Sequence, residues 1–180
     1  MNLVETFQNL VAQVPELVQP LIVALAGAIP FIEGEGAVSI GIIGGIPPVV
    51  AAIAAIVGNF LCVLVLVLVS AGARQSVVNR SKARQVALAG GGTVSDATAG
   101  PEPTGRGAGR REKFQRAFER YGVPGVSLLG PLVLPTQFTA TMLAASGIGK
   151  GRILFWQALA IIGWTTVLAV VVGTAVYAIR

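Results

Sequence analysis

The chain has 180 residues, of which 54% are hydrophobic and 12% are charged, and its mean hydropathy is +0.78. Soluble domains usually contain about 25% charged residues, so this composition argues against a soluble protein and places the chain in the membrane class. The sequence contains no histidine and a single cysteine, Cys62, which excludes imidazole catalysis, histidine metal sites and an internal disulfide.

Residues 1–73 are expected to form a first structural unit. Within it, residues 17–46 are apolar but are interrupted by Pro20, Pro30, two acids and a Gly-Gly pair. The resulting pieces, of roughly 10 to 14 residues, are too short to cross a bilayer and favour a re-entrant hairpin. Residues 48–73 are long and apolar enough for a transmembrane helix, and the two prolines before Val49 suit its start.

Residues 74–121 are expected to form a cytoplasmic linker. They hold ten of the thirteen Lys and Arg residues and carry a net charge of +6, and the positive-inside rule places such a segment in the cytoplasm. Residues 90–109 are rich in Gly, Pro, Ser and Thr, which is typical of a flexible segment. Residues 110–121 are predicted to form an amphipathic helix that either lies on anionic inner-leaflet headgroups or packs on the protein as a solvated helix. This location of the charge argues against nucleic acid as a partner.

Residues 122–180 are expected to form a second unit. Pro124, Pro131 and Pro135 interrupt the apolar residues 122–149, which are predicted to form a second re-entrant hairpin. Residues 153–179 are predicted to form a second transmembrane helix, with aromatic side chains near both ends as interfacial anchors. With the linker in the cytoplasm, the first hairpin would open to the outside and the second to the inside.

A shift of 105 residues aligns the two units without a gap and places Pro30 on Pro135 and Gly58 on Gly163. Both units have a hairpin followed by a span, in opposite orientations. The predicted fold is therefore all-α: a polytopic integral membrane protein with an inverted repeat of re-entrant helical hairpin plus transmembrane helix. Such repeats place the binding site near the midplane, where the broken helices meet. The alternative is four ordinary helices with proline kinks.

Two acids, Glu33 and Glu35, are the first candidate site residues, and they lie at the tip of the first hairpin. A charge at the centre of a lipid-facing helix costs about 2.5–3.5 kcal/mol, so two acids here imply a protein-lined or wet cavity, a partner or protonation. We expect one of the pair to hold a proton near neutral pH and to couple transport to the proton gradient. In the alternative, the tip lies at the outer interface and both acids are simply solvated.

The second tip reads LPTQFTAT and supplies the remaining candidates. Pro135 frees a backbone carbonyl, and Thr136, Gln137 and Thr139 add polar groups that either line a substrate path or satisfy the broken backbone. Asn59, in the first span, completes the set, although an Asn at this depth commonly bonds across helices. The sequence has no hydrolase motif, metal-ligand cluster or phosphate loop, so we expect no catalytic residue, no metal site and no cofactor.

The runs GAIPFIEGEGAVSIGIIGG…AAIAAIVGNF and FERYGVPGVSLLGPLVLPTQFTATMLAASGIGKGR resemble the small multidrug export family and, more distantly, the DedA-like (VTT-domain) membrane proteins. In the export family an acid precedes a Gly-Ala-rich half helix and a Gly-Asn pair follows, here Glu33 and Gly58-Asn59. The resemblance covers most of the chain apart from the linker. It implies two opposed re-entrant hairpins and movement of lipids or lipid-linked carriers. The arginines that DedA members have around the second proline are absent here.

The expected function is that of a transporter or flippase-like protein in the bacterial cytoplasmic membrane that moves a lipid or an amphipathic small molecule. An enzyme is not expected. The alternative is a non-transporting scaffold or assembly factor whose basic linker recruits a cytoplasmic partner. The expected partners are membrane lipids, including anionic inner-leaflet headgroups, and a second copy of the chain in a homodimer.

Overall fold

The computed structural model describes residues 3–88 and 122–179, and every regular element in these two ranges is a helix. The all-α class predicted from the sequence is therefore confirmed for the described residues. The predicted amphipathic helix 110–121 lies outside them. The elements in chain order are α1 (Leu3–Gln13), α2 (Gln19–Gly27), α3 (Glu33–Ile43), α4 (Pro48–Leu88), a helical stretch at 122–129 that continues as η1 (Gly130–Leu132), α6 (Thr136–Ala145) and α7 (Lys150–Ile179).

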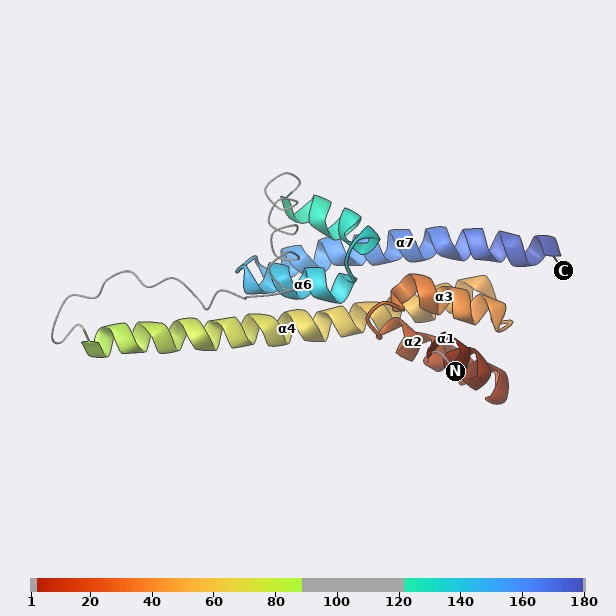
Figure 1. Ribbon diagram of the computed structural model, residues 1–180, viewed down its shortest axis with the longest axis horizontal. Coiled ribbons are helices and arrows are strands. Elements are labelled where there is room, and N and C mark those ends of the chain that lie inside the picture. The colour runs from red at the N-terminus through yellow and green to blue at the C-terminus, as the bar shows by residue number, and fades with distance from the viewer. Residues whose placement is uncertain (1–2, 89–121, 180) are drawn as a thin grey trace.

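The two long helices α4 and α7 form the axis of the molecule and run side by side in opposite directions (Figure 1). By length and hydropathy, both are able to cross a membrane. Large apolar side chains lie exposed along their outer faces, among them Leu61, Val65, Phe155 and Val170. Contiguous exposed apolar surface of this kind is typical of a face that contacts lipid or another protein.

Helix α4 is longer than the span expected from the sequence, because it runs on to Leu88 instead of ending near Ala73. The beginning of the expected linker is therefore helical. The reason lies in its residues, RQSVVNRSKARQVAL, which include Arg, Gln, Lys, Ala and Leu, all good helix formers, and contain neither Gly nor Pro. The first helix-breaking residue after this stretch is Gly90.

The first interrupted segment forms the short helices α2 and α3, joined by a tight turn. The backbone turns where Pro30 meets two residues with positive φ, Phe31 at 73° and Glu33 at 53°. A residue other than glycine rarely adopts this conformation, so the surrounding structure must hold it in place. The turn therefore presents Glu33 in a fixed direction at the tip of the hairpin.

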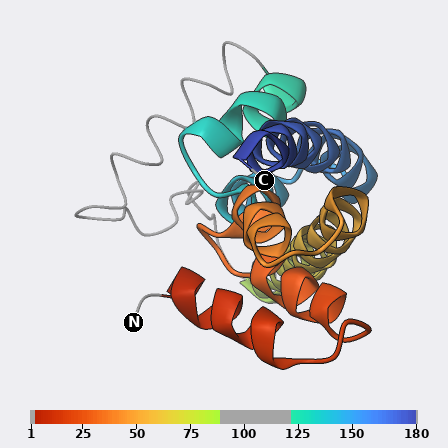
Figure 2. The same ribbon diagram turned by 90° about the vertical axis from the view of Figure 1, so that its right-hand side faces the viewer.

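Small residues let α2 lie unusually close to α4. A Cβ added at Gly58 would collide with the carbonyl of Ala24, and one added at Gly27 would lie 2.8 Å from the carbonyl oxygen of Ala55. Glycine at these two positions therefore allows backbone-to-backbone contact, an arrangement that is also common between membrane helices. Helix α1, which the sequence analysis did not predict, packs beside α2 at the periphery (Figure 2).

The second interrupted segment consists of residues 122–129, η1 and α6. Pro135 stands at the N-cap of α6 with φ −52° and ψ 142°, an extended conformation from which α6 begins directly. The residue before a proline is also disfavoured in the α region, so the chain leaves the helical path at Leu134. Neither residues 17–46 nor residues 122–149 form one continuous helix.

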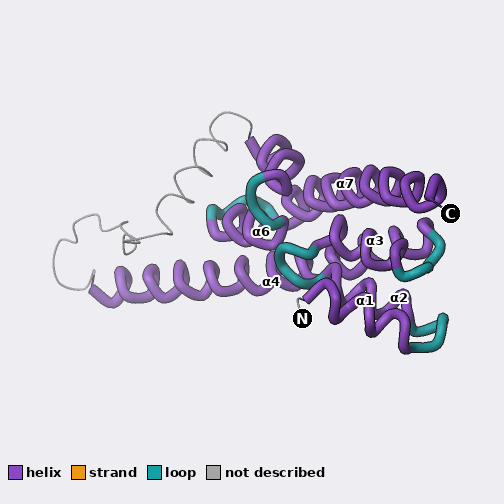
Figure 3. Tube along the Cα trace, turned by 45° about the vertical axis from the view of Figure 1, so that its right-hand side comes forward, coloured by secondary structure: helices purple, strands orange, loops and turns teal. Residues whose placement is uncertain are grey.

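The two broken pairs lie along opposite ends of the α4–α7 axis, and their loops meet near its middle (Figures 1 and 3). Two core clusters reflect this division. The first joins α2 and α3 to the beginning of α4, with Val38 and Ala55 as members, and the second joins α6 to the later part of α4, with Leu143 and Val67 as members. The site between the loops lies between the two clusters.

Candidate functional site

The tips of the two hairpins touch each other directly. The rings of Phe31 and Phe138 lie 6.1 Å apart at a tilt of 52°. Next to them, the backbone N–H of Thr136 donates a hydrogen bond of 2.6 Å to Oε1 of Glu33. These contacts join residues that are about one hundred positions apart in the sequence.

Glu33 acts as a helix cap supplied by the other half of the molecule. The first N–H groups of an α-helix have no partner within the helix, and the aligned peptide dipoles favour a negative charge there. Pro135 occupies the N-cap of α6 but has no side-chain oxygen with which to accept a hydrogen bond, and no side-chain cap is formed locally. The Glu33 carboxylate, only 6% exposed, takes over this role.

A buried polar cluster continues from this contact towards α4 and α7. The Thr136 hydroxyl lies 3.4 Å from Oδ1 of Asn59, and Nε2 of Gln137 donates to the same oxygen at 3.3 Å. The Thr139 hydroxyl donates to the Thr136 carbonyl at 2.9 Å and accepts from Nε2 of Gln157 at 3.1 Å. All five side chains are at most 3% exposed, so they form one network inside the protein.

Several polar atoms in and around this network have no hydrogen-bond partner among the described residues. They are Nδ2 of Asn59, Oγ of Ser127, Oε1 of Gln157 and Oγ1 of Thr165. Gly34 lies directly against the Thr165 hydroxyl, and an added Cβ there would collide with it. An unpaired buried polar group is unfavourable by about 1–3 kcal/mol, so these atoms make the region ready to accept water or a polar ligand.

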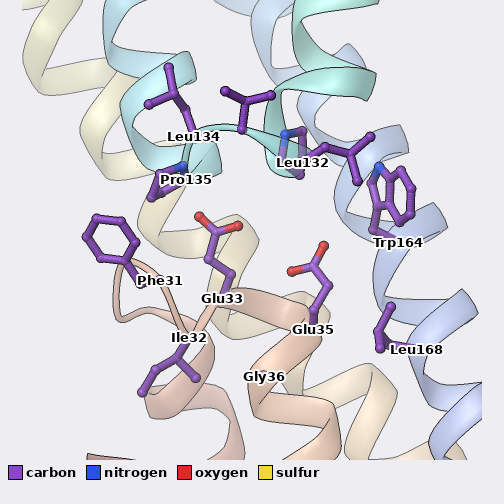
Figure 4. Close-up of a pocket in the computed structure, with 12 residues that line it drawn as sticks. Phe31, Ile32, Glu33, Glu35, Gly36, Leu132, Leu134, Pro135, Trp164 and Leu168 are labelled. Carbon is purple, nitrogen blue, oxygen red and sulfur yellow. The ribbon is translucent and has the colours of Figure 1, made fainter. Parts of the chain in front are cut away.

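A pocket of about 420 Å³ opens beside the Glu33 contact (Figure 4). This volume lies within the usual range for small-molecule sites. Its described lining residues come from both tips and from α7: Phe31, Ile32, Glu33, Glu35, Gly36, Pro131, Leu132, Val133, Leu134, Pro135, Trp164 and Leu168. The pocket is therefore largely apolar, with two carboxylates on one wall.

Of the residues predicted from the sequence, Glu33, Asn59, Thr136, Gln137 and Thr139 come together in the buried network. The other two, Glu35 and Pro135, line the pocket beside it. The structure thus brings all seven predicted residues to one place, in the junction between the two tips. Their functional roles remain predictions.

The sequence analysis did not identify Trp164, although the shift of 105 residues already aligned it with Asn59. Its indole N–H donates to the carbonyl of Leu128 at 2.9 Å, which ties α7 to the second hairpin. Its ring lines the pocket. Gln157 and Thr165, both on α7, were not among the predicted site residues, and both are fully buried in or beside the network.

The described residues contain no group of three or more Cys, Asp or Glu side chains placed to hold a metal ion. The arrangement offers instead two carboxylates, a row of hydroxyls and amides, and an apolar pocket. Such a set can bind and release a proton and can hold a ligand that has both a polar and an apolar part.

Comparison with protein-family models, with curated proteins and with solved structures finds no match for this chain. Its function is therefore argued from its own residues and geometry.

Proposed function

We propose that this protein is a polytopic transporter of the bacterial cytoplasmic membrane. It moves a lipid or an amphipathic small molecule through the site between the two hairpin tips, and it exchanges protons at Glu33 and Glu35. The observation that carries this proposal is the pocket itself: two carboxylates line an apolar cavity of about 420 Å³ where two broken helical pairs meet.

The depth of the site supports a position near the middle of a bilayer. Asn59 lies about 16 Å along α4 from Pro48, at 1.5 Å per residue. Thr165 lies about 22 Å along α7 from Lys150 and about 21 Å from Ile179. Because the hydrocarbon core is about 30 Å thick, a site about 16–22 Å from the beginning of α4 and from both ends of α7 lies near its midplane.

The arrangement of the broken helices also supports transport. One hairpin lies along each end of the α4–α7 axis, and helices α3 and α6 start at the shared junction and run apart (Figure 1). In transporters with inverted repeats, discontinuous helices meet at the substrate site, and alternating access follows when one repeat rocks against the other. We assign the two hairpin-plus-helix units to such a repeat.

The basic side chains favour one orientation. Because α4 and α7 run in opposite directions, Arg74, Lys150 and Arg152 lie at the same end of the molecule. Gly147, just after α6, packs against the Arg74 guanidinium, which is a favourable place for a cation near a helix C-terminus. This end would face the cytoplasm and its anionic inner-leaflet headgroups, in line with the positive-inside rule.

Proton exchange at Glu33 would act directly on the contact between the tips. An ionised carboxylate stabilises the N-terminus of α6 through charge and a hydrogen bond, whereas a neutral carboxyl has lost the charge. Binding of a proton at Glu33 would therefore weaken the joint between the hairpins and allow them to separate. This links the proton to the conformational change that transport requires.

Reconstitution of the purified full chain into proteoliposomes tests the proposal. A fluorescent lipid or amphiphile placed in one leaflet is expected to cross when a pH gradient is applied, and the double variant Glu33→Gln, Glu35→Gln is expected to lose this movement. Glu16→Gln, the same kind of substitution at a single exposed position, serves as the control. Movement that is absent in liposomes with the wild-type chain, for lipids and amphiphiles alike, would favour the scaffold with its basic linker instead.

A further inference from the structure

The two acids at the first tip have different surroundings. Glu33 is buried, and its carboxylate is occupied by the N–H of Thr136. Glu35 is partly buried, and its carboxylate interacts with its own backbone N–H but has no hydrogen bond or ion pair with another described residue. In Figure 4 the Glu35 carboxylate points into the space between Leu132 and Trp164, whereas that of Glu33 points towards Pro135. Both acids line the pocket, but an oxygen of Glu33 is occupied by the contact between the tips, whereas no other described residue occupies the Glu35 carboxylate.

The pocket into which Glu35 points is largely apolar. Beyond the two acids, the lining consists of aliphatic, aromatic, proline and glycine residues, and none of the described lining residues is basic. A carboxylate that is partly removed from water is stabilised by a nearby positive charge, because burial disfavours its ionised form. None of the described lining residues supplies such a charge, so a cationic ligand in the pocket would stabilise the ionised Glu35.

Trp164 adds a second preference for positive charge. The indole N–H is already donated to the carbonyl of Leu128, so the side chain can contact a ligand in the pocket only through its ring. The face of an indole ring attracts cations, and among aromatic side chains Trp does so best. Glu35 and Trp164 flank the same space in Figure 4.

We propose that Glu35, and not Glu33, is the acid that contacts the cargo, and that it receives an ammonium head carried on an apolar body. This inference rests on the proposed function in one respect, namely that the pocket is the cargo site. Glu33 also lines the pocket, but we assign it a positioning role, because its carboxylate holds α6 and the second tip in place. The apolar body lies against Leu132, Val133 and Leu168.

An ammonium head on an apolar body occurs in two sources: a membrane lipid such as phosphatidylethanolamine, and a free amphipathic amine or quaternary ammonium compound. Both would meet the same carboxylate and ring. The experiment therefore measures binding in a membrane without ammonium lipids and then adds the lipid as a competitor.

The test uses the full chain in nanodiscs of phosphatidylglycerol, with empty discs subtracted for unspecific uptake. The chain has two tryptophans, so Trp156→Phe leaves Trp164, in the pocket wall, as the fluorescent reporter. The probe is benzyltrimethylammonium, and its neutral isostere neopentylbenzene is the control ligand. Glu35→Gln, Glu33→Gln and the exposed Glu16→Gln are compared in this background, with Glu35→Asp as a further variant should Glu35→Gln not fold.

Glu35→Gln is expected to weaken benzyltrimethylammonium binding by about tenfold or more, or about 1.4 kcal/mol. The same variant should change the affinity for neopentylbenzene by less than about twofold, because this ligand has no charge for Glu35 to recognise. Glu16→Gln should change the affinity for either ligand by less than about twofold. Glu33→Gln is expected to change the affinity by less than about threefold while it lowers the unfolding temperature. Glu35→Asp keeps the carboxylate on a side chain that is one methylene shorter. It should bind the cation with an affinity between those of the wild-type chain and Glu35→Gln.

Equal affinity of the two ligands for the wild-type chain would overturn the inference. So would a loss in Glu33→Gln that matches or exceeds the loss in Glu35→Gln. Competition by phosphatidylethanolamine would identify the lipid as the source of the head group, and its absence would identify a free amphiphile. Cation binding without movement in proteoliposomes would refute the proposed function alone, and movement that Glu35→Gln leaves intact would refute this inference alone.

Discussion

The two hairpin tips differ in chemistry, and each supplies what the other lacks. The first tip presents carboxylates from a turn with positive φ at Phe31 and Glu33. The second presents the bare N-terminus of α6, preceded by a proline that cannot cap it. The two tips are joined by the hydrogen bond from the Thr136 N–H to Glu33. Two hairpins of similar shape are therefore held together by an acceptor on one tip and a free donor on the other.

The two hairpins also attach to their long helices in different ways. The first relies on close backbone contact at Gly27 and Gly58. At the position that aligns with Gly58, Gly163, an added Cβ would meet no atom within 4 Å. The second hairpin is held instead by side-chain packing and by hydrogen bonds, among them the one from Trp164 to Leu128. The first attachment depends on close backbone contact, whereas the second combines ordinary side-chain packing with several hydrogen bonds.

The largest expected effect comes from filling the close contact in the first half. Gly58→Ala places a Cβ against the carbonyl of Ala24, so we expect the free energy of unfolding to fall by about 3 kcal/mol, the upper end for overpacking. Gly163→Ala is the matched control and should be neutral or stabilising by up to about 1 kcal/mol, because alanine is the better helix former. Unfolding in mild detergent measures both, and equal losses would contradict the proposed difference in attachment.

The next effect concerns the cap that crosses between the halves. Glu33→Ala removes the acceptor for the Thr136 N–H and should lower the free energy of unfolding by about 2 kcal/mol. Pro135→Ser would provide a local N-cap, since the extended backbone at this position suits a capping serine. In that background Glu33→Ala should lower stability by about 1 kcal/mol or less.

Hydrogen exchange of the first amides of α6 provides a second measurement of this cap. Exchange should accelerate in Glu33→Ala and slow again when Pro135→Ser is added. Glu35→Ala, two residues along, is the control and should leave these amides protected. An identical loss from Glu33→Ala in both backgrounds would show that Glu33 stabilises the protein by another route.

A smaller effect is expected within the buried polar network. Thr139→Val removes a hydroxyl that both donates and accepts, and we expect it to lower the free energy of unfolding by about 1–2 kcal/mol. Thr165→Val removes a hydroxyl with no partner among the described residues and should leave stability unchanged or slightly raised. The same detergent unfolding assay compares the pair, and a larger loss for Thr165→Val would indicate that an unseen ligand or water binds there.

The smallest effect is expected at the polar attachment of the second hairpin. Trp164→Phe loses one hydrogen bond, to the carbonyl of Leu128, and should lower stability by about 1 kcal/mol. Trp156→Phe keeps the aromatic contact with Phe155, whose ring lies 5.4 Å away, and should change stability less. If both variants are equal within error, the hydrogen bond does not hold the second hairpin.

Much of the local structure followed from the sequence. Pro30 and Pro135 marked the two turns, and the unbroken apolar stretches marked the two long helices, because prolines and apolar runs of about 20 residues act on the backbone locally. The end of α4 was misplaced because the sequence was divided by polarity. A polar stretch of good helix formers continues a helix as readily as an apolar one.

The sequence by itself determined that residues 3–88 and 122–179 are largely helical, that they break at two proline turns, and that two acids and a set of hydroxyls and amides lie at those turns. Only the tertiary structure decided that the two turns meet, and that Glu33 and Glu35 have different surroundings. Two residues apart in the chain, they looked equivalent, but the cap on α6 and the wall of the pocket come from residues about one hundred positions away. Interactions over such distances depend on packing and leave no local pattern to read.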